Sequence, residues 1–173
     1  KRLVGLILVI GLFIFSSVEA QINNFPGIVS GGDYSAYNVD ASVYMIESND
    51  GINFDVRRIS DIGISGLCVV VADVSNDGIE DIIVCEQGKF HVLYGKDIIK
   101  GKRTFNSKTF SVSNPNSNLI ELRHVVSGDF NEDGISDLAF VDKGEIEDGE
   151  KGLYIFLSNG GEKLVQWNFY SIP

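Results

Sequence analysis

Short apolar runs, separated by polar turn residues, follow one another along the chain from about residue 41 onward. Valine, isoleucine, phenylalanine and tyrosine dominate the runs at 67–72, 82–85, 90–95 and 138–141. Runs of this length, rich in β-branched and aromatic residues and bounded by Gly, Asn and Asp, are typical of β-strands. The pattern therefore predicts an all-β protein.

Two of the polar turns are near-copies of one another. Both follow D-x-[SN]-x-D-G-x-x-D, the first at 73–81 and the second at 129–137. A tightly curled chain turns oxygen donors at alternate positions inward, and the glycine at position six permits the sharp bend. The expected metal ligands are Asp73, Ser75, Asp77, the carbonyl of Ile79 and Asp81 in the first loop, and Asp129, Asn131, Asp133, the carbonyl of Ile135 and Asp137 in the second.

Calcium is the cation that suits these loops best, which predicts two Ca²⁺ sites. It accepts six to eight oxygen ligands in a tolerant geometry, whereas magnesium demands a strict octahedron and zinc prefers Cys and His, which neither loop contains. An EF-hand would need a Glu at position twelve, where Val84 and Phe140 stand. A metal-free Asp/Gly-rich hairpin turn is the alternative for either copy alone.

The repeat extends beyond the loops. The segment 43–51 matches the segment 153–161, and their spacing is about twice that between the two loops. Each unit reads as strand, loop, strand, connection, strand, turn, strand, and four strands in about 55 residues are typical of a β-propeller blade. We therefore expect about 2.5 four-stranded antiparallel blades, in units of roughly 41–60, 64–113 and 119–172.

Residues 72–82 and 128–138 resemble the FG-GAP/VCBS repeats of integrin alpha-chain-like propellers. The resemblance covers about residues 41–173, although no Phe-Gly or Gly-Ala-Pro element occurs and Ser75 stands where Asn or Asp is more usual. It implies that calcium binds between the first two strands of each blade. It also implies a propeller commonly of seven blades, and recognition or adhesion through a protein or glycan ligand.

The segment 1–20 has the pattern of a secretory signal peptide. Lys1 and Arg2 precede an apolar run at 3–15, and small residues lead to an expected cleavage after Ala20. The run is shorter than the roughly 20 residues that span a bilayer, which leaves a signal anchor as the weaker alternative. We expect a secreted or otherwise extracellular or periplasmic protein whose residues 21–173 form a partial propeller.

Fewer than three blade units fit in the chain, whereas a ring needs at least about four blades. The chain is therefore expected to be a piece of a larger propeller; self-association into a ring and a small open arc are the alternatives. Its formal net charge of −10 disfavours nucleic acid and anionic membranes as partners, and no later segment could span a membrane.

The two cysteines flank the first loop. If Asp73 faces Asp81 across the hairpin, Cys68 pairs with Glu86, and the thiols of Cys68 and Cys85 lie on opposite faces. A one-residue shift would bring the thiols together. A disulfide and two buried free thiols both remain open.

Evidence for catalysis is thin, because His91 and His124 lie in strand patterns without a recognisable nucleophile. We therefore expect a non-enzymatic recognition or adhesion module with structural calcium. The alternative is a propeller or lectin-like domain of a secreted polysaccharide-active enzyme whose catalytic part is not in this chain.

Overall fold

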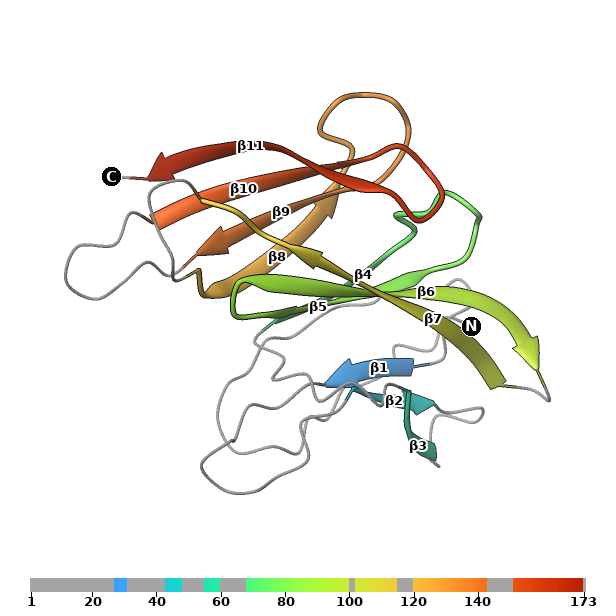
Figure 1. Ribbon diagram of the computed structural model, residues 1–173. Coiled ribbons are helices and arrows are strands. Elements are labelled where there is room, and N and C mark those ends of the chain that lie inside the picture. Colours follow the sequence, from blue (N-terminus) through green and yellow to red (C-terminus); the bar gives the residue numbers. More distant parts are fainter. Residues whose placement is uncertain are drawn as a thin grey trace, which may run out of the picture.

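The computed structural model describes residues 27–30, 43–47, 55–59, 68–99, 102–114, 120–142 and 151–172 (Figure 1). The expected signal peptide at 1–20 lies outside these residues. Within them every regular element is a β-strand, which confirms the all-β prediction. No helix long and apolar enough to cross a membrane occurs in this described part.

The strands form three antiparallel sheets in chain order, each strand pairing with the next. The first sheet contains β1 (Gly27–Ser30), β2 (Tyr44–Glu47) and β3 (Asp55–Arg58). The second contains β4 (Cys68–Ala72), β5 (Asp81–Glu86), β6 (Lys89–Ile99) and β7 (Lys102–Ser111). The third contains β8 (Leu122–Gly128), β9 (Asp137–Asp142), β10 (Lys151–Ser158) and β11 (Leu164–Ile172).

Two features of the strands differ from the sequence prediction. β1 was not predicted, because its short sequence carries no alternating pattern. The β6–β7 hairpin is longer than the runs at 90–95 and 104–112, because an irregularity between Gly95 and Ile98 lets pairing resume as far as Ile99 and Lys102.

The three sheets are stacked, with β4–β7 in the middle (Figure 1). We call the face of a sheet that points toward the preceding sheet in the chain its proximal face, and the opposite face its distal face. The proximal face of β4–β7 packs on the first sheet in a cluster that includes Val43, Met45, Ile82, Val84 and Leu93. Its distal face packs on β8–β11 in the larger cluster, with side chains from both sheets.

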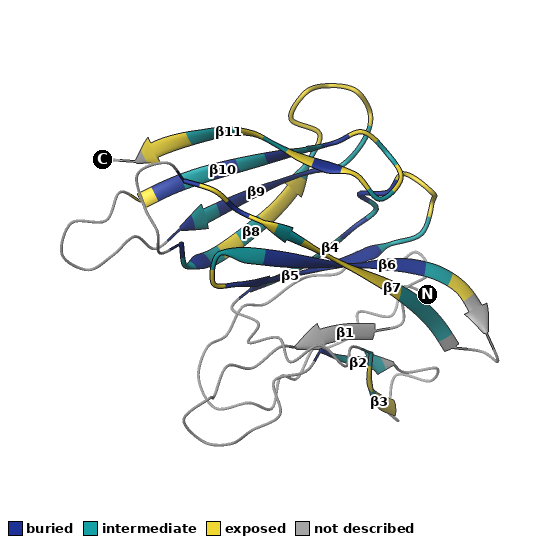
Figure 2. Ribbon diagram, viewed as in Figure 1, coloured by how far each residue is buried: buried dark blue, intermediate teal, exposed yellow. Residues whose placement is uncertain are grey.

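Strand β5, in the middle sheet, is buried along its whole length (Figure 2). Ile82 and Val84 face the first sheet, while Ile83 and Cys85 face the third. This explains why its sequence is continuously apolar between two acidic ends rather than alternating, because a strand covered on both faces has no solvent side.

Four phenylalanine rings join the second sheet to the third. Phe90 contacts Phe110, Phe140 and Phe156, with ring centroids 5.1, 4.5 and 4.9 Å apart. Phe140 and Phe156 meet edge to face at 5.6 Å. Burying each ring contributes on the order of 1.5–3 kcal/mol, and edge-to-face contacts add to that.

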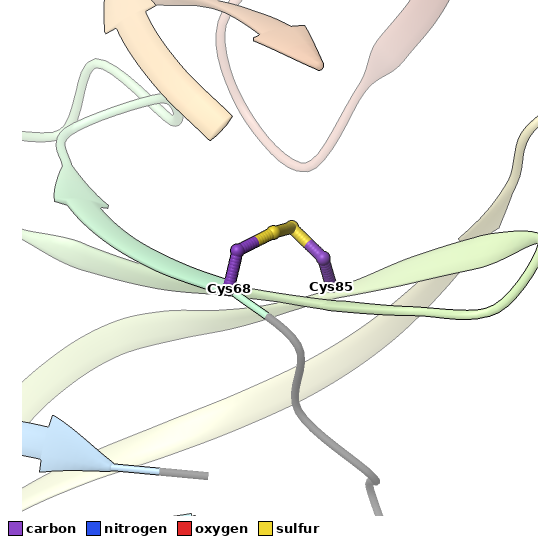
Figure 3. The surroundings of a disulfide bond; sticks show 2 residues. All are labelled: Cys68 and Cys85. Atoms are coloured by element: carbon purple, nitrogen blue, oxygen red, sulfur yellow. A yellow bond between two sulfur atoms is a disulfide. The ribbon is translucent and has the colours of Figure 1, made fainter. Parts of the chain in front are cut away.

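Cys68 and Cys85 form a disulfide between β4 and β5, with their Cα atoms 5.1 Å apart (Figure 3). The expected register was wrong by one residue, since Asp81 pairs with Ala72 rather than with Asp73. The reason is that Asp73 already belongs to the turn, where its carboxylate accepts backbone amide protons. The shift puts both cysteines on the distal face of the sheet, within the larger cluster.

Candidate metal site

The first loop connects β4 to β5 and is held in a curl by its own carboxylates. Asp73 accepts hydrogen bonds from the backbone amides of Asp77 at 3.2 Å and Gly78 at 2.9 Å. Asp77 accepts one from the amide of Ile79 at 2.9 Å. The hydroxyl of Ser75 donates to Asp73 at 3.3 Å. The side chains at positions one and three are thus bonded to each other, and the side chain at position five bonds to the backbone of the same loop.

The second loop, between β8 and β9, repeats this network. Asp129 accepts from the amides of Asp133 at 3.1 Å and Gly134 at 2.8 Å, and Asp133 accepts from the amide of Ile135 at 2.9 Å. Asn131 donates to the Asp133 carboxylate at 2.9 Å. The two loops therefore share the backbone bonds accepted at positions one and five, while the side chain at position three donates to Asp73 in the first loop and to Asp133 in the second.

The backbone conformations also match. Position four has a positive φ in both loops, 55° at Asn76 and 63° at Glu132, and position six has 82° at Gly78 and 83° at Gly134. A Cβ at either glycine would meet no atom within 4 Å. The glycines are therefore required for their left-handed conformation and not for lack of space.

The ninth residue of the motif has a role that the sequence did not reveal. Asp81 is fully buried. One of its oxygens accepts from the amides of Val74 at 3.1 Å and Ser75 at 3.0 Å, and the other accepts from Gly95 on β6 at 2.9 Å. Asp81 therefore fastens the start of its loop to the third strand of its sheet.

Asp137 does the same in the third sheet. It is fully buried and accepts from the amide of Phe130 at 3.0 Å and from the amide of Ser158 on β10 at 2.8 Å. The sequence feature that could have revealed this role is that Asp81 and Asp137 are each the first residue of an apolar strand. A carboxylate oxygen that accepts one amide bond keeps a second lone pair for a cation, which holds for both oxygens of Asp137 and for the Asp81 oxygen bonded to Gly95.

Negative charge is concentrated in the first loop. Burial raises the pKa of Asp81 to about 6, against the opposing hydrogen bonds from Gly95 and Ser75, and the charges of Asp73 and Asp77 raise it further. Burial, followed by the charge of Asp73, also raises the pKa of Glu80. A bound cation would relieve this repulsion.

The donor set of both loops fits calcium in its chemistry, since it consists of carboxylate, hydroxyl, amide and carbonyl oxygens. In the part of the chain that the structure describes, no three His, Cys, Asp or Glu side chains are arranged as a group that could hold a metal ion. The expected set also includes the Ser75 hydroxyl, the Asn131 amide and two carbonyl oxygens. The fit therefore rests on the oxygen chemistry and on the shared curl of the loops.

The first loop is bonded directly to the third sheet. The hydroxyl of Ser158 donates to the carbonyl of Val74 at 2.6 Å, and the amide of Gly161 donates to the carbonyl of Ser75 at 2.7 Å. Ser158 is also the residue whose amide donates to Asp137. Ser158 thus connects the first loop with the second.

His91, which the sequence places in a strand, is buried in β6. Its Nδ1 lies 2.9 Å from the hydroxyl of Thr109, and its Nε2 lies 3.2 Å from a Glu86 carboxylate oxygen, in an orientation that makes no hydrogen bond. Burial, followed by the charge of Lys89, lowers the pKa of His91. Its surroundings are those of a structural residue packed within the sheet.

Comparison of this chain with models of protein families, with curated proteins and with solved structures finds no match in any of the three.

Proposed function

We propose that this chain is an exported calcium-binding module built from β-propeller blades of the FG-GAP/VCBS type, and that it serves recognition or adhesion through a protein or glycan ligand. The observation that carries the proposal is the agreement of the two loops in motif, hydrogen bonding and backbone conformation. Two unrelated metal-free turns have no reason to agree in all three respects.

The blade assignment is supported by the two complete meanders. β4–β7 and β8–β11 each have four antiparallel strands in chain order, and each has its loop between the first and second strands. β4 and β8, the first strands of the two meanders, lie in contact. Radial repetition of such sheets is how propellers are built.

Calcium would be held by Asp73, Ser75, Asp77, Asp81 and the carbonyl of Ile79, and by the corresponding set in the second loop. The bound ion supplies positive charge that neutralises the clustered carboxylates and ties the first two strands of each sheet. Because the unfolded chain has no formed site, binding would stabilise the fold. The role of calcium is therefore structural.

The proposed role in recognition rests on the resemblance to the repeat family and on the expected export, because a fold alone does not assign a function. The alternative, a lectin-like domain of a polysaccharide-active enzyme, is favoured by one observation. Trp167 and Tyr170 on β11 are 57% and 43% exposed, and exposed aromatic rings can stack on sugars.

The calcium proposal is tested by calorimetry and thermal melting of the exported chain, with calcium and with EGTA. We expect two binding sites and a higher melting temperature with calcium. Asp133→Asn should remove one site. Glu132→Gln is the matched control, because it removes one charge from the same loop at a position outside the expected ligand set. Equal melting temperatures with calcium and with EGTA would contradict the proposal.

A further inference from the structure

The two interfaces between sheets are oriented in the same direction along the stack. When the chain is aligned on Asp73 and Asp129, the first residues of the two loops, Ile82 and Val84 correspond to Leu138 and Phe140. Both pairs are buried on the proximal face of their sheet, the first against β1–β3 and the second against β4–β7. The stack is therefore head to tail, with the distal face of one sheet covered by the proximal face of the next.

The repeat that relates 43–51 to 153–161 indicates the same orientation for the first sheet. In the alignment of 43–51 with 153–161, Val43 and Met45 correspond to Leu153 and Ile155. Val43 and Met45 are fully buried on the distal face of the first sheet, against β5 and β6. Leu153 and Ile155 occupy the same positions in the third sheet, where they are only partly buried.

Apolar side chains lie on all four strands of the distal face of β8–β11, together with His124, Lys151 and Asn168. Val126 on β8 is 57% exposed and pairs with Ala139, which pairs with Ile155. Val165 is 56% exposed and pairs with Leu157, and Tyr170 pairs with Leu153. Directly paired residues share a face, so these side chains form one surface.

Among the described residues, the opposite end of the stack is the proximal face of the first sheet. There Ile46 pairs with Val56, which is 58% exposed, and Tyr44 and Ile46 are partly buried. Six large hydrophobic side chains are exposed among the described residues, and five of them lie in the two end sheets. The five are Val56, Val126, Val165, Trp167 and Tyr170.

We propose that the distal face of β8–β11 binds the proximal face of β1–β3 of a second copy of this chain. Such a contact would continue an interface that the chain already makes twice within itself. Exposed apolar patches rimmed by polar residues mark association sites. A head-to-tail contact uses two different faces, and so it generates either a closed ring or an open filament.

The association depends on the two faces alone and not on the propeller assignment proposed above.

The association is tested by sedimentation equilibrium of the exported chain in calcium, from about 1 to about 100 µM, the range in which weak interfaces become measurable. Val165→Lys changes the distal face and Val56→Lys the proximal face, both at exposed positions that the fold tolerates. We expect each to weaken association at least about tenfold, because a lysine charge would be buried in the contact. Ser107→Lys, at an exposed position of β7, is the control for the added charge and should associate normally.

Mixing the two variants distinguishes head-to-tail binding from a distal-to-distal contact. Each variant keeps one intact face, so a mixture of Val165→Lys and Val56→Lys should form a heterodimer that neither forms alone. A distal-to-distal dimer would instead be abolished by Val165→Lys and unaffected by Val56→Lys, which would overturn the proposal. A chain that stays monomeric at every concentration would also overturn it, and the distal face would then be open to a partner other than a second copy.

Discussion

Asp81 and Asp137 show how one residue type serves two purposes within a motif. The acidic residues at positions one and five lie near the surface and bond within their own loop, whereas the ninth is fully buried and bonds to the third strand of its sheet. Hydrogen bonds to a charged group contribute more than neutral ones, and removing a buried acceptor leaves its donors unsatisfied. The ninth residue should therefore matter even when no metal is present.

Asp137→Ala should destabilise the protein by about 2–4 kcal/mol in EGTA, because it leaves the amides of Phe130 and Ser158 without an acceptor. Asp133→Asn should change the free energy of unfolding little in EGTA and should lower it only when calcium is present. Urea denaturation in both conditions separates the two roles. Equal stability of Asp137→Ala and the parent chain in EGTA would contradict the fastening role.

The buried His91 gives stability a pH dependence. Its pKa is lowered in the folded state, by burial and then by Lys89, so the unfolded state binds the proton more readily. Its contribution is therefore present above the ordinary histidine pKa of about 6.5 and is lost as the pH falls below it. In EGTA, the stability of His91→Gln should fall less than that of the parent between pH 7 and pH 5. Parallel curves would show that His91 does not titrate with unfolding.

At the scale of the element, the strands could be read from the sequence but their register could not. The apolar runs of β5, β6 and β9 are long and lie between strong turn signals, so they predicted strands directly. The register depended on whether Asp73 ends a strand or begins a turn, and only its bonds to the amides of Asp77 and Gly78 decide that. The bond from Ser158 to Val74 joins segments far apart in the chain, which no local pattern reveals.

The disulfide stabilises the middle sheet. Replacing both cysteines, as Cys68→Ala with Cys85→Val, should cost about 3 kcal/mol, since the bond closes a chain segment near the length for which loop entropy predicts that value. The third sheet has His124 and Val141 at the corresponding positions, so it offers no second bridge. Urea denaturation with and without dithiothreitol measures the effect. The reductant should destabilise the parent chain and leave the double variant unchanged.

At the scale of the whole molecule, the stack gives its sheets unequal support. The middle sheet has neighbours on both faces, while each end sheet has one among the described residues. In an array of repeats, stability is approximately a sum over units and nearest-neighbour interfaces. The middle sheet should therefore open last.

Hydrogen exchange measures this order directly. We expect the amides of β5 to exchange most slowly and those of β3 much faster, because β5 is buried on both faces and joined to β4 by the disulfide. Opening of the most protected strands approaches the global free energy of unfolding. Equal protection of β3 and β5 would show that the stack unfolds as a single unit.

The bridge through Ser158 has a consequence for how the protein would respond to calcium. An ion in the first loop would hold Ser75 by its side chain, and the carbonyls of Ser75 and its neighbour Val74 accept from Gly161 and Ser158. Ser158 in turn donates to Asp137, so part of the ordering that the second ion requires would already be complete. If both loops bind calcium as proposed, the two sites should therefore fill cooperatively, with a steeper dependence on calcium concentration than two independent loops would show.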